Sequence, residues 1–141
     1  MRTLLPLGLF ALLTAQASPA ELEIQVQGLR NANGQVRLCL TRNPAHFPDC
    51  NGDPAAVRRS LPARAAASIH LRGVPAGVYA LSVIHDENGD GRLNRFMAIP
   101  REGFGFSRNP VVRFGAPKFR QVDIKLGSGF TRASVRMQYL L

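Results

Sequence analysis

The sequence predicts an all-β fold, a single antiparallel β-sandwich of about seven strands. Short runs in which apolar and polar residues alternate recur along the chain, and this period of two is typical of strands with one buried face. Most of the 13 glycines and 10 prolines fall between these runs, as they do in turns. Helical periodicity is scarce, so we expect two sheets packed face to face around one core.

The first 20 residues are predicted to be a secretory signal peptide that precedes the fold. Arg2 provides a short positive region, residues 4–13 an apolar stretch, and small residues end two candidate cleavage sites, after Ala17 and after Ala20. The apolar stretch is shorter than the roughly 20 residues of a membrane-spanning helix, although an uncleaved anchor is the alternative. We therefore expect an exported protein, periplasmic or extracellular, with no membrane span.

Residues 21–141 are expected to form one domain, because about 121 residues can enclose one core but leave no room for a second. Without Arg2 this part carries 17 basic and 9 acidic residues, a net charge of +8, which favours anionic partners. Cys39 and Cys50 are predicted to form a disulfide, since export exposes them to oxidation. A metal pair or catalytic thiol is the alternative, but the spacing is too wide for C-x-x-C, and His46 alone does not complete a zinc site.

The first two alternating runs, "ELEIQVQGL" and "QVRLCLT", flank "NANG" and are expected to form a hairpin. The apolar residues of each run share one face: Leu22, Ile24 and Val26 in the first, Val36, Leu38 and Leu40 in the second. Prolines and a glycine interrupt residues 43–64, so we expect a long connection there, in which "PAAVRRS" makes one helical turn.

Alternation resumes in "AASIHLRGV", where Ile69 and Leu71 are expected to point inward and His70 toward solvent. The run "VYALSVIH" is expected to be a central strand covered on both faces, because its second face is also largely apolar. The segments "RQVDIKLG" and "ASVRMQYLL" are expected to be the last strands, with one face formed by Val122, Ile124, Leu126, Val135, Met137, Tyr139 and Leu141. We predict a core in which Tyr79, Leu81 and Val83 pack against Ile24, Val26, Val135 and Met137.

One long stretch of the chain, "LRGVPAGVYALSVIHDENGDGRLNRFMAIPREGFGFSRNP", resembles a bacterial exported family known as domain of unknown function 2141. The matching pieces begin with a Pro-x-Gly-x-Tyr strand (Pro75, Gly77 and Tyr79), a His-Asp-Glu-Asn-Gly loop (85–89) and a Leu-Asn step (Leu93 and Asn94). They continue with an Ile-Pro (Ile99 and Pro100) and a Glu-Gly-aromatic-Gly-Phe-Ser segment (102–109). Phe104 and Arg108 depart from the tyrosine and asparagine common in the family. The resemblance implies a transthyretin-like (prealbumin-like) or carboxypeptidase-regulatory-like sandwich and implies no activity.

The loop "HDENGDGRLN" has the spacing of an oxygen-ligand calcium loop. Asp86, Asn88 and Asp90 alternate, and Gly91 permits the tight turn that follows. The complete expected ligand set is the side chains of Asp86, Asn88, Asp90 and Asn94 with the carbonyl of Arg92. Met97 stands where an EF-hand has its bidentate carboxylate, so we expect either weak Ca²⁺ binding or a polar turn with no cofactor.

His85 precedes this loop, with Asp86 beside it and Glu102 and Ser107 further along the chain. A serine hydrolase needs a base, an oxyanion hole and a strand-to-helix elbow, and "FGFSRN" lacks the elbow. We expect His85 to end the buried face of its strand and to bond a backbone carbonyl or a loop carboxylate. We therefore predict no catalytic residue and expect that the protein is not an enzyme.

Basic and aromatic residues interleave over 92–120. The predicted anion-binding or polymer-binding residues are Arg95, Arg101, Arg108, Arg113, Lys118 and Arg120. Because export argues against nucleic acid, the expected partner is an acidic envelope polymer or another envelope protein. The alternative is that the phenylalanines belong to the core and the arginines to its solvated rim. The sequence thus favours a non-catalytic binding or accessory module of the cell envelope, with a purely structural domain and, third, a hydrolase as alternatives.

Overall fold

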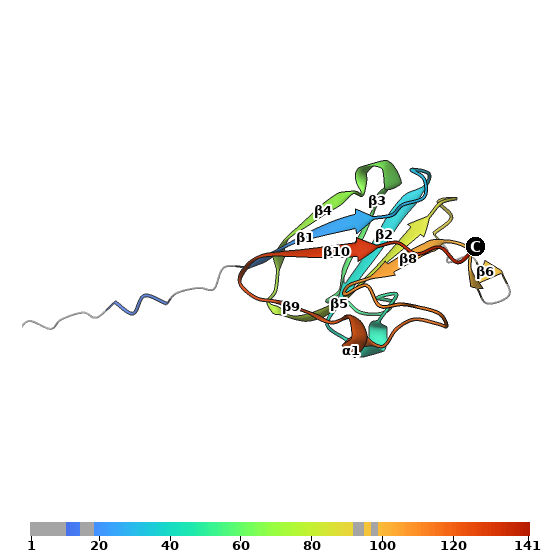
Figure 1. The fold of residues 1–141 in the computed structure, drawn as a ribbon. Helices are drawn as coiled ribbons and strands as arrows, with labels where there is room; N and C mark the ends of the chain where they lie inside the picture. Colours follow the sequence, from blue (N-terminus) through green and yellow to red (C-terminus); the bar gives the residue numbers. More distant parts are fainter. Residues whose placement is uncertain (1–10, 15–18, 92–94, 97–98) are drawn as a thin grey trace, which may run out of the picture.

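The computed structural model describes residues 11–14, 19–91, 95–96 and 99–141, and for 95–96 and 99–100 it describes the backbone only. Two β-sheets pack face to face, as the sequence predicted (Figure 1). The first sheet has the order β10-β1-β4, with β10 over Gly129–Arg136, β1 over Ala20–Gln27 and β4 over Ser68–Val74. The second has the order β3-β2-β5-β8, with β3 over Val57–Pro62, β2 over Gln35–Thr41, β5 over Gly77–Asp86 and β8 over Gly103–Phe106.

Shorter elements complete the sandwich. β9 (Ile124–Leu126) pairs with the start of β5, and β6 (Arg95–Phe96) pairs with β7 (Ile99–Pro100) in a separate ribbon. The short helices are η1 (Pro44–His46), η2 (Ala63–Ala65) and α1 (Phe119–Val122). Within the described part of the chain, no helix is both long and apolar enough to cross a bilayer.

The predicted hairpin between the first two strands is wrong, because β1 and β2 lie in different sheets. Both strands bury the faces that alternation predicted, since Leu22 and Ile24 are fully buried on one sheet and Val36 and Leu40 on the other. The linker from Gly28 to Gly34 is longer than the roughly 2 to 5 residues of most hairpin loops and takes the chain from one sheet to the other.

The sandwich also contains a parallel pair, although we expected antiparallel sheets. β1 pairs with β10 in parallel, from Ala20 opposite Gly129 to Gln27 opposite Arg136, and pairs with β4 in antiparallel fashion on its other side. The first and last long strands of the chain are therefore neighbours, with β1 in the middle of the first sheet and β10 at its edge (Figure 1).

Two local expectations are also wrong. The segment "PAAVRRS" does not form a helical turn, because residues 57–62 are strand β3, which pairs with β2. β3 is an edge strand on which the neighbouring residues Arg58 and Arg59 are both exposed. Charged residues are common on edge strands, and here they interrupt the apolar-polar alternation from which the other strands were predicted. Residues 120–127 do not form one strand either, because α1 ends at Val122 and β9 begins at Ile124.

The main core lies between the two sheets and confirms the predicted packing. A single buried cluster contains Tyr79, Leu81, Val83, Ile24, Val26, Val135 and Met137. His70 is exposed, and Ile69 and Leu71 are buried, as expected for that strand. The strand predicted for residues 133–141 is too long, because β10 ends at Arg136. Beyond it Tyr139 is half-buried, whereas Leu141 remains 48% exposed.

A second, smaller core covers the outer face of β5 and β8. It contains Ala80, Phe104, Phe106 and Val122, with Phe47, Val112 and Phe119 packed against it. The central strand is therefore covered on both faces over much of its length, as predicted, although Val78 near its start is 45% exposed. The helix α1, the loop before it and the loop after η1 supply this cover (Figure 1).

The disulfide between Cys39 and Cys50 is present, as predicted, with 5.7 Å between the α-carbons. Cys39 lies on β2 and Cys50 follows the loop that carries Phe47. The bond therefore fastens this loop over the second core. A hydrogen bond from the Ser82 hydroxyl to the carbonyl of Pro48 (2.5 Å) joins the same loop to β5.

Candidate metal centre

The candidate site lies where β5 ends beside β8. In the antiparallel register, Ile84 is opposite Phe104 and His85 is opposite Gly103. Continuing this register by one pair places Asp86, the last residue of β5, opposite Glu102. Directly opposed residues of an antiparallel pair point to the same face of the sheet. Two carboxylates that are distant in sequence therefore become cross-strand neighbours.

The loop after β5 folds back over Asp86. The amide of Gly89 donates to the carbonyl of Asp86 (3.3 Å), and the amide of Gly91 donates to Oδ2 of the Asp86 side chain (2.8 Å). Gly89 and Gly91 have φ angles of 69° and 73°, in the left-handed region that glycine adopts most readily. This tight turn carries Asp90 back toward the end of β5.

Three carboxylates meet at this turn. One oxygen from each of Asp86, Asp90 and Glu102 lies within 4.8 Å of the other two. Asp86 and Glu102 are buried, with exposures of 1% and 4%, and Asp90 is exposed. The Oδ1 atom of Asp86 is buried and accepts no hydrogen bond from the described residues. A cation is one partner that can stabilise such an oxygen, and hard oxygen ligands suit Ca²⁺ or Mg²⁺.

The predicted calcium ligands fare differently in this arrangement. Asp86 and Asp90 are brought together, whereas Asn88 serves the turn: its Oδ1 accepts from the amide of Asp90 and its Nδ2 donates to Asp90 Oδ2, both at 3.2 Å. The predicted ligands Arg92 and Asn94 lie outside the described residues. The sequence did not predict Glu102 in this group, because its place beside Asp86 depends on strand pairing that sequence spacing does not reveal.

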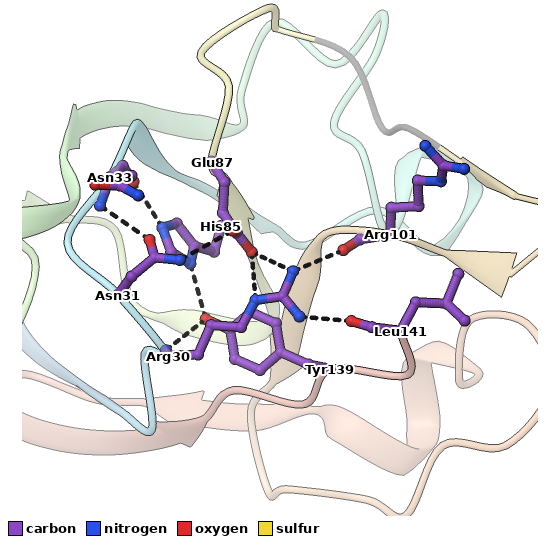
Figure 2. A network of polar contacts seen from close by, with 8 residues as sticks. All are labelled: Arg30, Asn31, Asn33, His85, Glu87, Arg101, Tyr139 and Leu141. Carbon is purple, nitrogen blue, oxygen red and sulfur yellow. Dashed lines mark hydrogen bonds and ion pairs between the residues drawn. The ribbon is translucent and has the colours of Figure 1, made fainter.

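A polar network lies next to the carboxylates, and Figure 2 shows its eight residues. His85 is fully buried, with Nε2 at 2.7 Å from the carbonyl of Asn33 and Nδ1 at 2.8 Å from the hydroxyl of Tyr139. Because a carbonyl only accepts, Nε2 carries the proton of that bond, and Nδ1 shares a second hydrogen bond with the Tyr139 hydroxyl. The predicted bond from His85 to a backbone carbonyl is confirmed, and the contact with Tyr139 is additional.

Arg30 is the centre of this network. Its guanidinium donates to Glu87 Oε1 (2.7 Å), to the carbonyl of Leu141 (2.5 Å) and to the carbonyl of Arg101 (3.2 Å). It also lies 4.5 Å from the centroid of the Tyr139 ring. Glu87 follows Asp86 and Arg101 precedes Glu102, so Arg30 connects the two chain segments that carry the carboxylates (Figure 2).

The network shifts the acidity of two of its members. Burial of Glu87 opposes ionisation, but hydrogen bonds from Asn31 and Arg30 and the charge of Arg30 outweigh it, so the pKa of Glu87 is lowered. Burial raises the pKa of Tyr139, and the nearby charge of Glu87 acts in the same direction. Glu87 is therefore an ionised partner of Arg30 at neutral pH.

Ser107 has a role in the backbone framework. It is fully buried, and its hydroxyl accepts from the amide of Leu81 (3.1 Å) and donates to the carbonyl of Val122. These bonds join β5 to the end of α1. Both Ser107 and His85 therefore use their polar atoms to connect separate segments of the sandwich.

The predicted anion-binding residues whose side chains the structure describes all lie on the surface. Arg101, Arg108, Arg113, Lys118 and Arg120 are exposed, and the side chain of Arg95 lies outside the described residues. Arg108 is paired with Asp123 at 2.7 Å. Phe104 and Phe106 belong to the second core, as in the alternative interpretation, but Phe114 is 96% exposed. Arg113 and Lys118 lie on the same segment as this phenylalanine.

Comparison with known proteins identifies a family for the chain. A search of curated proteins and a search of solved structures each gave no match. A family model described as "Uncharacterized protein conserved in bacteria" matches residues 24–134, which include nearly the whole sandwich and all three carboxylates. The chain therefore belongs to the bacterial family of domain of unknown function 2141.

Proposed function

We propose that the protein is an exported, non-catalytic binding module in which Asp86, Asp90 and Glu102 hold a Ca²⁺ ion. The observation that carries this proposal is the buried Oδ1 of Asp86, which has no hydrogen-bond donor among the described residues and belongs to a group of three carboxylates. Carboxylate oxygens are the ligands that Ca²⁺ prefers, and each carboxylate can supply one or two of them. The ion would stiffen the loop at residues 86–91 against β8.

The ligand set favours Ca²⁺ over Mg²⁺. One of the three carboxylates, on Asp90, is exposed on a loop, and water completes the coordination. Ca²⁺ accepts six to eight oxygens in irregular geometry, whereas Mg²⁺ demands near-octahedral geometry. Calcium sites of extracellular modules bind at roughly 0.1 to 1 mM, and we expect this range here.

The site is tested by thermal unfolding of the purified protein with EDTA, CaCl₂ or MgCl₂ at millimolar concentration. We expect CaCl₂ to raise the melting temperature, because a ligand that binds only the folded state stabilises it. Asp86→Asn and Glu102→Gln should each remove the rise. The control is Glu21→Gln, which removes a carboxylate from the outer face of the other sheet and should retain the rise. A rise that survives in Glu102→Gln would place the ion in the sequence-predicted loop without Glu102, and a flat wild-type response would exclude the site.

The proposed partner is an acidic component of the cell envelope. The chain has a net charge of +9, and the exposed basic side chains of residues 101–120 supply much of it. Retention on an immobilised acidic polysaccharide should fall steeply as salt rises, because exposed charges separated by more than about 8 Å are screened at 0.15 M. Retention that does not depend on salt would contradict electrostatic binding.

A purely structural domain is the second candidate. The closed hydrogen-bonding pattern of Arg30, His85, Glu87 and Tyr139 favours it, because these groups satisfy one another. In that case neither Ca²⁺ nor an acidic polymer would change the melting temperature.

The signal-like sequence of residues 1–20 supports export, and finding the full-length chain in the cytoplasmic fraction would contradict it.

A further inference from the structure

We propose that residues 110–118 form a loop that inserts Val111 and Phe114 into the surface of an anionic lipid bilayer. The inference rests on the acidic partner of the proposed function and names it: phosphate-bearing lipid headgroups with acyl chains beneath them. It does not depend on the calcium site.

Exposure of apolar side chains is the first observation. Phe114 is 96% exposed and Val111 is 83% exposed, whereas Phe47 and Phe119 in the neighbouring segments pack into the second core. Water contact around a whole phenylalanine ring is unfavourable, and neighbouring exposed apolar residues mark surfaces that bind a partner or a membrane. The loop therefore holds apolar area that the fold itself leaves uncovered.

Charge is the second observation and selects the kind of surface. Arg113 lies between the two apolar residues, and Lys118 and Arg120 follow, all of them exposed. From Gly103 to Val122 the sequence contains no acidic residue. Basic residues around an exposed aromatic ring are typical of segments that lie at a membrane interface, where cations contact phosphates and the ring enters the acyl boundary.

The anchoring of the loop is the third observation. At its start, Asn109 is fixed to β10, because its Nδ2 donates to the carbonyl of Ser134 (2.9 Å) and its Oδ1 accepts from the amide of Arg136 (2.7 Å). At its end, Phe119 packs edge-on against Phe47 at a centroid distance of 6.2 Å. Between them the chain leaves β8 as a long loop and returns at α1 (Figure 1).

This combination favours a lipid surface over an acidic polysaccharide. A polysaccharide is held by the cations and can stack one sugar ring on Phe114, but it has no apolar interior that takes up the exposed side chains of both Val111 and Phe114. A bilayer takes up both the cations and the apolar side chains, since headgroups meet Arg113 and Lys118 while acyl chains surround Phe114. Two apolar side chains give only reversible binding, so electrostatic attraction is needed in addition.

Binding is tested by co-sedimentation of the purified protein with vesicles of phosphatidylglycerol and phosphatidylcholine, or of phosphatidylcholine alone. We expect binding to the anionic vesicles only. Phe114→Ala should weaken it roughly tenfold or more, as expected from the loss of a buried phenylalanine side chain. Lys118→Ala should weaken it about fivefold. The matched control is Phe130→Ala, because Phe130 is also exposed, at 56%, but lies on β10 in the first sheet.

Insertion is measured separately with a fluorescent residue. The chain contains no tryptophan, so Phe114→Trp introduces a single indole. Its emission should shift to shorter wavelength with anionic vesicles and be quenched by lipids brominated on the acyl chain. Phe130→Trp should show neither change. If the Phe114→Trp variant binds the vesicles while its indole emission stays unchanged, the insertion is overturned.

The remaining outcomes separate the inference from the proposed function. Retention on an acidic polysaccharide with no vesicle binding overturns the inference and supports a polymer partner. Absence of both overturns the inference and the acidic partner together. If Phe114→Ala instead abolishes self-association in light scattering and leaves vesicle binding unchanged, the exposed ring serves a second copy of the chain and the inference is wrong.

Discussion

Glu87 is the residue at which the polar network responds most directly to pH. Its pKa lies below the ordinary value of 4.5, so its ionised form adds stability above pH 4.5, and this contribution is lost as pH falls through the folded-state pKa. Glu87→Gln should lower the free energy of unfolding by about 1 kcal/mol at pH 7, a value discounted because Glu87 and Arg30 are partly exposed.

The measurement is urea unfolding of the wild type and Glu87→Gln in EDTA between pH 3 and 7. The difference between them should be constant above about pH 5 and shrink below 4.5. EDTA removes any effect of a cation at the neighbouring Asp86. A difference that grows toward acid would mean that Arg30 does not hold Glu87 in its ionised form.

At this scale the sequence predicted those contacts that depend on neighbours along the chain. Asp86 and Asp90 belong to one turn, so their proximity follows from their spacing in the sequence and does not depend on which strands pair. Glu102 joins them only through the pairing of β5 with β8, and Arg30 reaches Glu87 across 57 positions. Contacts of this kind follow from which strands pair, and a pattern of period two does not encode that.

The central strand β5 supplies the largest test of packing. Leu81 is fully buried in the main core, so Leu81→Ala should lower the free energy of unfolding by about 2 to 5 kcal/mol. Val78 is on the same strand but 45% exposed, and Val78→Ala should change it by less than about 0.5 kcal/mol. Urea unfolding measures both. Equal effects would show that the two faces of β5 have been assigned wrongly.

The strand β8 depends on its glycines. A Cβ on Gly105 would lie 2.5 Å from Cγ1 of Val135 and 3.0 Å from the carbonyl oxygen of Arg136, and one on Gly103 would lie 2.3 Å from the Tyr139 ring. These positions therefore allow β8 to approach the end of β10 closely. The repeated glycine of "EGFGFS" thus has a packing reason at each position.

Gly105→Ala should accordingly lower the free energy of unfolding by about 1 to 3 kcal/mol. Gly127 is the matched control, because a Cβ there meets no described atom within 4 Å. Gly127→Ala should be neutral or slightly stabilising, since it restricts the unfolded chain. Differential scanning calorimetry of both variants checks this, and a neutral Gly105→Ala would mean that β8 and β10 can separate without loss.

At the scale of elements, the sequence predicted which faces are buried better than which strands pair. The buried faces of β1, β2, β4 and β5 were all predicted, because alternation depends on burial. The partners of β1 were not, since a buried apolar face fits either sheet of a sandwich. Strand β3 was missed for another reason: an edge strand with exposed Arg58 and Arg59 needs no alternation.

For the whole molecule, the disulfide is the covalent constraint that can be removed most simply. Closing a loop of this size restricts the unfolded chain by about 2 to 3 kcal/mol in the chain-entropy model, so replacing Cys39 and Cys50 with alanine should lower stability by that amount. Urea unfolding with and without reductant checks this, and the double variant should not respond to reductant. Mass spectrometry of the protein purified without reductant should find the bonded form, and two free thiols there would contradict it.

The parallel pairing of β1 with β10 sets the order in which the protein can fold. A chain emerging from its N-terminus presents β1 first, yet the partner of Val26 is Val135, near the other end of the sequence. Contacts between such distant segments form slowly, because the intervening chain must be ordered before they add stability. The first sheet therefore stays incomplete until nearly the whole chain is available. For the export that we propose, this delay would keep the chain competent for transport and leave folding to the far side of the membrane.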